Sequence, residues 1–231
     1  MMMALDNATR STKQAANGQN GSRVSARLKE HIVEIISDSG EGAQKCGQSF
    51  GSIVARMGHG VWTVEIIPAE IRPPARSVAG ASGNRRRIGE QRVTNGGNET
   101  DLVIAFNEQV LLGRVRSKEL KPGCTILLES MWRQSPDPKI RRSYVEAYEQ
   151  LTAAGYRVYE IPMEDECHKL VSDTRKGKNM FALGILCSIY SLDLQIARDQ
   201  VKLTFAKKSE KVIETNISLL EAGFNWADGN L

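Results

Sequence analysis

Five short β-type runs alternate with longer amphipathic stretches, and this alternation is the feature that most constrains the fold. Several of the runs are apolar at consecutive positions, so both faces of these strands have to be covered. Helices on both faces of a mostly parallel sheet provide that cover. The sequence therefore predicts an α/β protein whose strands are His31–Ile36, Val61–Ile66, Leu102–Phe106, Thr125–Glu129 and Tyr156–Ile161.

A helix is predicted between the first two strands, over Ala43–Met57. Its apolar residues recur at i, i+3, i+4 and i+7, which is the stripe of a helix that packs on a sheet. With the two flanking strands, this helix predicts a right-handed βαβ unit. The expected fold class is a mostly parallel sheet with flanking helices, of the Rossmann-like kind.

The carboxyl-terminal third changes to closely spaced helical patterns. Three helices are predicted, over Asn179–Tyr190, Leu194–Lys207 and Glu210–Ala222, with Gly223 as the C-cap of the last. We expect them to form a helical subdomain that docks on the sheet.

The first 29 residues have a different composition. They are rich in Asn, Gln, Ser, Ala and Gly and have no periodic apolar pattern, so the sequence predicts a disordered tail over 1–29. The domain is then expected over 30–224, with a sheet part over about 30–172 and a helical part over about 177–223.

The net charge of +4 argues against a nucleic-acid partner. Residues 1–30 hold five basic and two acidic residues, so the remaining chain is close to neutral. A nucleic-acid-binding domain carries its basic excess on the folded body instead.

Four widely spaced cysteines indicate a reduced protein without a cysteine-ligated metal. Cys46, Cys124, Cys167 and Cys187 form no C-x-x-C pair, and the chain has no apolar run of the length that spans a bilayer. No signal peptide is apparent at the amino terminus. We expect a cytoplasmic chain with no membrane partner, whose thiols are small core side chains.

The turn Ser37–Gly42 lies between the first strand and the first helix, where glycines aim backbone N–H groups at an anion. Its glycines do not complete G-x-G-x-x-G, because Lys45 stands where the third glycine belongs, and no Walker A lysine follows. The alternative interpretation makes Asp38 or Ser39 the N-cap, with Glu41 in the first helical turn.

Catalytic signals are few. The turn Gly40-Glu41-Gly42 is similar to the start of a thiamine diphosphate motif, but the chain contains no Asn-Asn pair. His31, His59 and His168 all suit structural roles, and there is no G-x-S-x-G elbow or Cys-His dyad.

The segment Pro68–Gly97 is too long for a simple connection. Either a strand is hidden near Arg87–Val93 or the loop is functional. Its arginines allow two interpretations, an anion or partner clamp and a solvated basic run. They are Arg72, Arg76, Arg85, Arg86 and Arg87.

Four segments, in this order and spacing, resemble the γ-type domain of 2-oxoacid:ferredoxin oxidoreductases, most closely the 2-oxoglutarate type. The chain departs from the pattern at Ser37, where glycine is expected, and at Glu41, and it has no α domain after Gly223. The departure after Gly223 indicates a separate γ subunit or one domain of a longer chain. The segments are Ser37–Gln44, Pro68–Pro74, Asp101–Asn107 and Lys178–Gly184.

The resemblance implies a non-redox subunit that helps enclose coenzyme A and holds the assembly together. The whole complex would convert a 2-oxoacid and coenzyme A to acyl-coenzyme A, carbon dioxide and reduced ferredoxin. The complex would use thiamine diphosphate with Mg²⁺, bound between α- and β-type partner subunits, and iron–sulfur clusters held in other parts. The chain would meet ferredoxin only indirectly, through the complex. This chain is expected to bind none of these cofactors and to be inactive alone.

Two other functions remain open from the sequence. A stand-alone nicotinamide or flavin oxidoreductase is favoured by Glu65, which stands near the end of the second strand, where a ribose-binding acid would lie. A purely structural interaction subunit with no ligand is the other.

The expected ligand-facing surface lies at the carboxyl ends of the strands, because loops that leave parallel strands share one edge of the sheet. Its residues, facing coenzyme A or a partner, are Ser39, Gly40, Glu41, Gly42, Arg72, Arg76 and Asn107.

Overall fold

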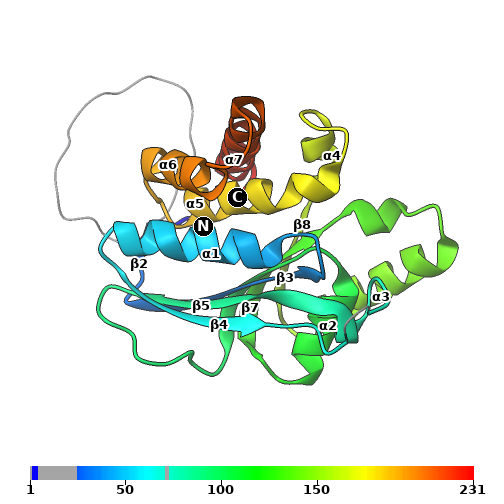
Figure 1. Ribbon diagram of the computed structural model, residues 1–231. Coiled ribbons are helices and arrows are strands. Elements are labelled where there is room, and N and C mark those ends of the chain that lie inside the picture. The colour runs from blue at the N-terminus through cyan, green and yellow to red at the C-terminus, as the bar shows by residue number, and fades with distance from the viewer. Residues whose placement is uncertain (1, 5–24, 71–72) are drawn as a thin grey trace.

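A six-stranded mixed sheet forms the centre of the computed structural model, which describes residues 2–4, 25–70 and 73–231 (Figure 1). Its strand order is β4-β5-β3-β6-β7-β8. Strands β3, β6, β7 and β8 run parallel, whereas β5 is antiparallel to both of its neighbours. The bounds are β3 Glu30–Asp38, β4 Gly60–Ile66, β5 Ala81–Gly89, β6 Thr100–Ala105, β7 Leu120–Glu129 and β8 Arg157–Ile161.

Helices cover both faces of this sheet, as the apolar runs predicted. One face carries α1 and the group α5, α6 and α7, and the other carries α2 and α3 (Figure 1). The α-helices are α1 Ala43–Arg56, α2 Glu108–Arg116, α3 Pro138–Ala153, α4 Met163–His168, α5 Lys178–Ile189, α6 Leu194–Thr204 and α7 Glu210–Asn230. Short 3₁₀ turns are η1 Val78–Gly80, η2 Met131–Gln134 and η3 Thr174–Lys176.

Each face of the sheet has its own hydrophobic core. The α1 side joins strand residues such as Ile35 to helix residues such as Phe50 and Leu183, so α5–α7 share one core with the sheet. The other side packs Val103 and Ile126 against Val110 of α2. The predicted α/β class, the five strands and the helices α1, α5 and α6 are therefore confirmed.

The predicted βαβ unit is wrong in one respect, because β4 does not lie beside β3. Strand β5 inserts between them, pairing Arg86 with Val33 on one side and with Thr63 on the other. This is the strand hidden in the long segment, although it spans Ala81–Gly89 instead of Arg87–Val93. Its three consecutive arginines gave no apolar pattern, and ion pairs hold two of them, Arg85 and Arg87, in the sheet.

The interpretation of Arg85–Arg87 as a solvated basic run is also wrong. Arg85 is buried and donates from Nε to Glu34 Oε1 at 2.7 Å, and it also pairs with Glu119. Arg114 donates to Glu34 from the other side, at 2.7 Å. Carboxylates of this chain therefore already bind the guanidinium groups of Arg85 and Arg114, and these ion pairs link β5, β3 and α2.

Gly223 is not a helix cap. Helix α7 continues to Asn230, and Gly223 lies at its crossing with α5. A Cβ atom on Gly223 would lie 2.0 Å from the carbonyl oxygen of Phe181, and one on Gly184 would lie 1.9 Å from that of Leu220. The two glycines therefore allow the helix backbones to approach each other.

Part of the predicted tail forms strands. Residues Met2–Ala4 (β1) and Ser25–Arg27 (β2) pair in parallel as a separate two-stranded sheet. Residues 1 and 5–24 lie outside the described residues, so the tail stays a prediction there.

Candidate functional site

The turn after β3 leaves the start of α1 open. Gly40 and Gly42 have φ angles of 92° and 89°, in the left-handed region that glycine adopts most easily. Gly42 is the N-cap and has no side chain, so no side chain accepts from the first N–H groups of α1. The predicted capping by Asp38 or Ser39 is therefore wrong, and no described side chain caps these N–H groups at the positive end of the helix dipole.

Asp38 is held away from the helix by the following loop. Its Oδ2 accepts a hydrogen bond from the backbone N–H of Arg76, at 2.7 Å. Arg76 has a φ of 53° and ion-pairs with Glu108, and its guanidinium carbon lies 4.1 Å from the centre of the Trp132 ring. Arg76 is thus anchored where the ends of β3 and β6 meet.

Asn107 has a structural contact of its own. Its Oδ1 accepts from the N–H groups of Gln109 and Val110, at 3.0 and 3.1 Å, and so caps α2. The expected convergence therefore brings Arg76 beside the turn after β3 and beside the start of α2. Arg72 lies outside the described residues.

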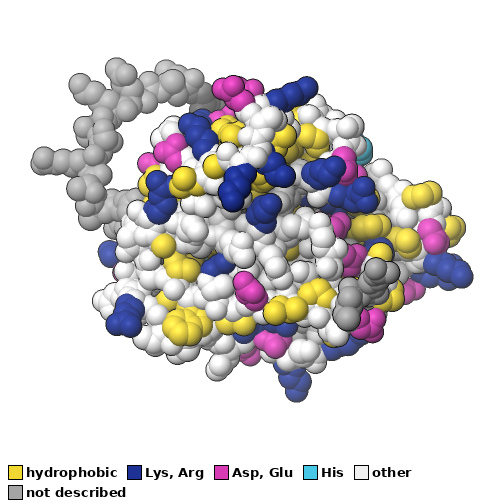
Figure 2. Space-filling model, viewed as in Figure 1, with side chains coloured by type: hydrophobic (Ala, Val, Ile, Leu, Met, Phe, Trp, Pro, Cys, Tyr) yellow, Lys and Arg dark blue, Asp and Glu magenta, His cyan; other side chains and the backbone are white. Residues whose placement is uncertain are grey.

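A basic cleft of about 400 Å³ lies in front of the start of α1. Four of its lining side chains are cations, and one is an acid, Glu41. On the face shown in Figure 2, Lys and Arg side chains gather between α1 and the α6–α7 pair. The cleft is lined by Gly40, Glu41, Gly42, Lys45, Arg175, Lys176, Asn179, Phe205, Lys208, Val212 and Asn216.

Two asparagines in the basic cleft have spare hydrogen-bonding capacity. Asn179 and Asn216 are each 7% exposed, and their Oδ1 atoms have no partner among the described residues. A side chain at Gly42 would place its Cβ 2.7 Å from Nδ2 of Asn179. The cleft therefore combines four cations with an uncapped helix start, which is a suitable setting for a polyanionic ligand, and the two Oδ1 atoms can accept hydrogen bonds from donor groups of the same ligand.

Glu41 is the one acid of the basic cleft, and a cation partly neutralises it. Its carboxylate accepts from the Asp38 N–H at 3.1 Å and lies 3.3 Å from Lys178 Nζ. Burial raises the pKa of Glu41, and the nearby Lys178 only partly offsets that rise. The cation thus neutralises this acid on the side away from the basic cleft.

The sequence singled out none of the four cations of the basic cleft as site residues, and it also gave no role to Lys178, which lies behind Glu41. Lys178 is 2% exposed, and its Nζ lies 3.3 Å from Glu41 and 3.4 Å from Glu164. Although burial alone would lower its pKa, Glu41, Glu129 and Glu164 together raise it. In the sequence, Lys178 is only the first residue of the Lys178–Gly184 motif. The carboxylates that surround it come from three distant segments, so the motif alone indicates no role for this lysine.

Glu129 makes the folded state sensitive to pH. Burial raises its pKa to about 7, although N–H groups of Met131 and Glu164 and the charge of Lys178 lower it. In the unfolded chain the pKa returns to near 4.5. The folded state therefore binds more protons between these two values, so this contribution is present at low pH and is lost as pH rises through about 7.

We expect Glu129→Gln to remove this dependence. The measured quantity is the free energy of unfolding of the native chain minus that of the variant. This difference should fall by roughly 3 kcal/mol between about pH 4.5 and about pH 7, and it should stay constant at higher pH. Urea denaturation of both proteins across this range measures the difference. A difference independent of pH would contradict the assignment.

The remaining residues singled out from the sequence have structural contacts. His31 Nδ1 lies 2.6 Å from the hydroxyl of Tyr190 in the core, and His168 lies 3.4 Å from Glu164. All four cysteines are free and buried, and burial raises the pKa of each thiol. Glu65 is exposed on β4, which β5 separates from β3, so it does not stand at the ribose position.

No cluster of three or more His, Cys, Asp or Glu residues within the described ranges could hold a metal ion. No helix in those ranges is both long and apolar enough to cross a membrane.

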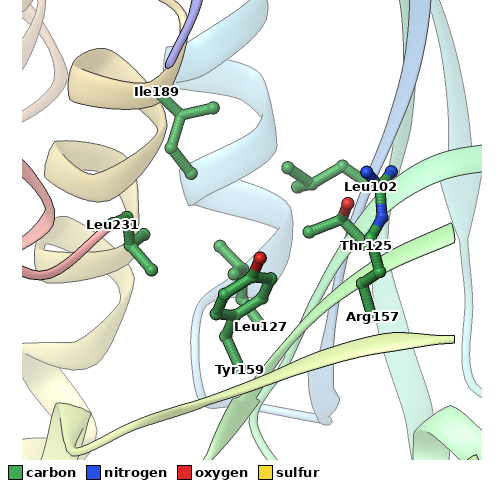
Figure 3. A pocket seen from close by; sticks show the side chains of 7 residues that line it. All are labelled: Leu102, Thr125, Leu127, Arg157, Tyr159, Ile189 and Leu231. Carbon is green, nitrogen blue, oxygen red and sulfur yellow. The ribbon is translucent and has the colours of Figure 1, made fainter. Parts of the chain in front are cut away.

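An apolar cavity of about 60 Å³ lies between the sheet and the ends of α5 and α7 (Figure 3). Leu127 and Tyr159 border it from the sheet, and Ile189 and Leu231 from the helices. It is too small for a cofactor, and the basic cleft remains the candidate site.

Comparisons with known proteins agree on one family. Residues 33–226 match the profile of the pyruvate ferredoxin/flavodoxin oxidoreductase family. The chain is 29% identical over 210 residues to the 2-oxoglutarate oxidoreductase subunit KorA of Mycobacterium tuberculosis, covering 87% of this chain and 32% of that protein. It spans about a third of the length of the curated relatives it matches.

Solved structures share the fold. The 2-oxoglutarate:ferredoxin oxidoreductase of Magnetococcus marinus, solved with 2-oxoglutarate, coenzyme A and succinyl-CoA bound, has a TM-score of 0.70 at 23% identity, over 88% of this chain and 32% of that one. The γ subunit of a keto/oxoacid ferredoxin oxidoreductase from Geobacter sulfurreducens has a TM-score of 0.60 at 16% identity. The match covers 87% of this chain and 98% of that subunit.

Proposed function

Because the chain belongs to the pyruvate ferredoxin/flavodoxin oxidoreductase family, we propose that it is the non-redox γ-type part of a 2-oxoacid:ferredoxin oxidoreductase complex. The complex would convert a 2-oxoacid and coenzyme A to acyl-coenzyme A and carbon dioxide, and pass electrons to ferredoxin. The family match over most of the domain carries this proposal. The overlap with nearly the whole of a solved γ subunit supports the γ-type assignment.

The proposed partners are α- and β-type subunits or domains. They would hold the thiamine diphosphate, Mg²⁺ and iron–sulfur clusters, which supply decarboxylation and electron transfer. This chain would hold the assembly together and help enclose coenzyme A. Four free, buried thiols support the proposal that it works in the reducing cytoplasm.

We propose that the basic cleft binds the phosphates of coenzyme A. Coenzyme A carries a diphosphate and a separate 3′-phosphate, so it is a polyanion with an adenine ring. Lys45, Arg175, Lys176 and Lys208 offer cations to these phosphates, and the uncapped start of α1 offers backbone N–H groups. Phe205 gives the same cleft a ring on which an adenine could stack.

Lys208→Glu is expected to raise the Michaelis constant for coenzyme A about tenfold to a hundredfold, because it replaces a charged phosphate contact with a repulsive one. The measurement uses the complex recovered from the native cells through a tag on this chain. That complex should reduce ferredoxin with a 2-oxoacid and coenzyme A, whereas the isolated chain should not.

Lys207→Glu is the matched control. Lys207 is the adjacent exposed lysine, and it does not line the basic cleft. Lys207→Glu changes the net charge by the same amount as Lys208→Glu. Equal effects of the two substitutions would remove the cleft from the coenzyme A site. A recovered complex without 2-oxoacid oxidation would contradict the proposed function itself.

A further inference from the structure

Strand β4 is an edge strand with an unprotected outer side. Within the described residues it pairs with β5 alone, so its outer backbone N–H and C=O groups have no strand partner. Edge strands are usually guarded by lysine, proline or a bulge, because an open edge templates further pairing. The sequence of β4, Gly-Val-Trp-Thr-Val-Glu-Ile, contains neither lysine nor proline.

The outer face of β4 is apolar. Trp62 and Val64 are 42% and 41% exposed. They lie on the face opposite α1, because Glu65 pairs with Asn84, which contacts Gly47 of α1. Alternation along the strand then puts Trp62 and Val64 on the other side. An aromatic and a β-branched residue thus lie two positions apart beside the open edge, and Gly96 of the chain's own following loop packs against part of both side chains.

The two ends of β4 carry opposite charges. Arg56 ends α1 just before β4, and the segment that contains Arg92 runs beside Gly60. Glu65 and Glu70 lie at the other end. All four charged side chains are exposed, and none makes an ion pair with another described residue. The edge is therefore basic at its start and acidic at its end.

We propose that β4 pairs with β4 of a second copy of this chain, antiparallel and centred on Thr63. Thr63 is the middle residue of the seven-residue strand, so this register pairs the whole strand with its copy. In this register Trp62 of each copy lies opposite Val64 of the other copy, which gives two symmetric pairs. Pairs of an aromatic and a β-branched residue are favourable across antiparallel strands. The antiparallel arrangement also brings the basic end of each strand to the acidic end of the other.

The resulting interface is isologous and closes as a dimer. Two six-stranded sheets become one continuous sheet across the symmetry axis. This inference is independent of the coenzyme A site, because the basic cleft lies at the start of α1 and β4 follows the end of that helix.

Thr63→Cys tests the register directly in the full chain. Because residue 63 faces itself across the axis, its two Cα atoms lie within the range that a disulfide bridges. We expect most of the variant to become a covalent dimer under mild oxidation. The four native thiols are buried, so they do not compete. By light scattering, the unmodified chain should have the mass of two chains.

Leu203→Cys is the matched control, since Leu203 is exposed at 64% on α6 and lies away from β4. It should give little covalent dimer. Val64→Lys should reduce the mass to that of one chain, whereas Leu203→Lys should not. A monomeric native chain, or cross-linking of Thr63→Cys no greater than that of Leu203→Cys, would overturn the proposal.

Discussion

Lys178→Met is expected to lower the free energy of unfolding by about 4 kcal/mol at neutral pH, because it leaves buried carboxylates without their cation. Lys178 lies within 3.4 Å of both Glu41 and Glu164, and its charge also stabilises Glu129. Methionine is an unbranched side chain one atom shorter than lysine, so it fills most of the same space and removes the charge with its N–H donors. Urea denaturation at neutral pH measures the loss.

The expected loss becomes smaller as pH falls. Glu129, whose pKa is raised to about 7, takes up a proton as pH falls below that value, and the pKa of Glu41 is shifted in the same direction. A protonated carboxyl group carries no charge that Lys178 has to neutralise. Lys176→Met is the control, because Lys176 is exposed and its one ion pair with a described residue is the surface pair with Asp173. Its effect should stay within about 0.5 kcal/mol. Similar losses for both variants, or a Lys178→Met loss that does not shrink in acid, would contradict this account.

Gly184→Ala is expected to cost about 3 kcal/mol or more and to lower the melting temperature by roughly 6–12 °C. The added Cβ would lie 1.9 Å from the carbonyl oxygen of Leu220 and 2.7 Å from the Phe224 nitrogen, so α5 and α7 have to separate. Both contacts are with backbone atoms, which cannot rotate away. Thermal unfolding followed by circular dichroism measures the change.

Gly229→Ala provides the comparison within α7. Nothing lies within 4 Å of a Cβ atom at that position, so the substitution should be neutral or slightly stabilising through helix propensity. Gly223→Ala should resemble Gly184→Ala, because its Cβ would meet the Phe181 carbonyl at 2.0 Å. If Gly184→Ala melted like Gly229→Ala, the close crossing of α5 and α7 would be wrong.

The sequence determined which segments become strands and helices wherever a face had to be buried. The apolar runs of β3, β6 and β7 and the stripe of α1 are local patterns with the periods of the elements themselves. Tertiary packing buries the apolar faces that these local patterns already define. The turn after β3 was also found from sequence, since its glycines stand between a strand and a helix.

Only the tertiary structure decided what charged and glycine residues do. Arg85 gave no strand signal because Glu34 and Glu119, whose carboxylates make its burial possible, come from distant segments. Gly223 gave the same local signal as a helix cap, yet its role depends on Phe181. Lys178 likewise depends on Glu41 and Glu164. The energy of such a residue depends on which partners the fold brings to it, and local sequence patterns contain no record of those partners.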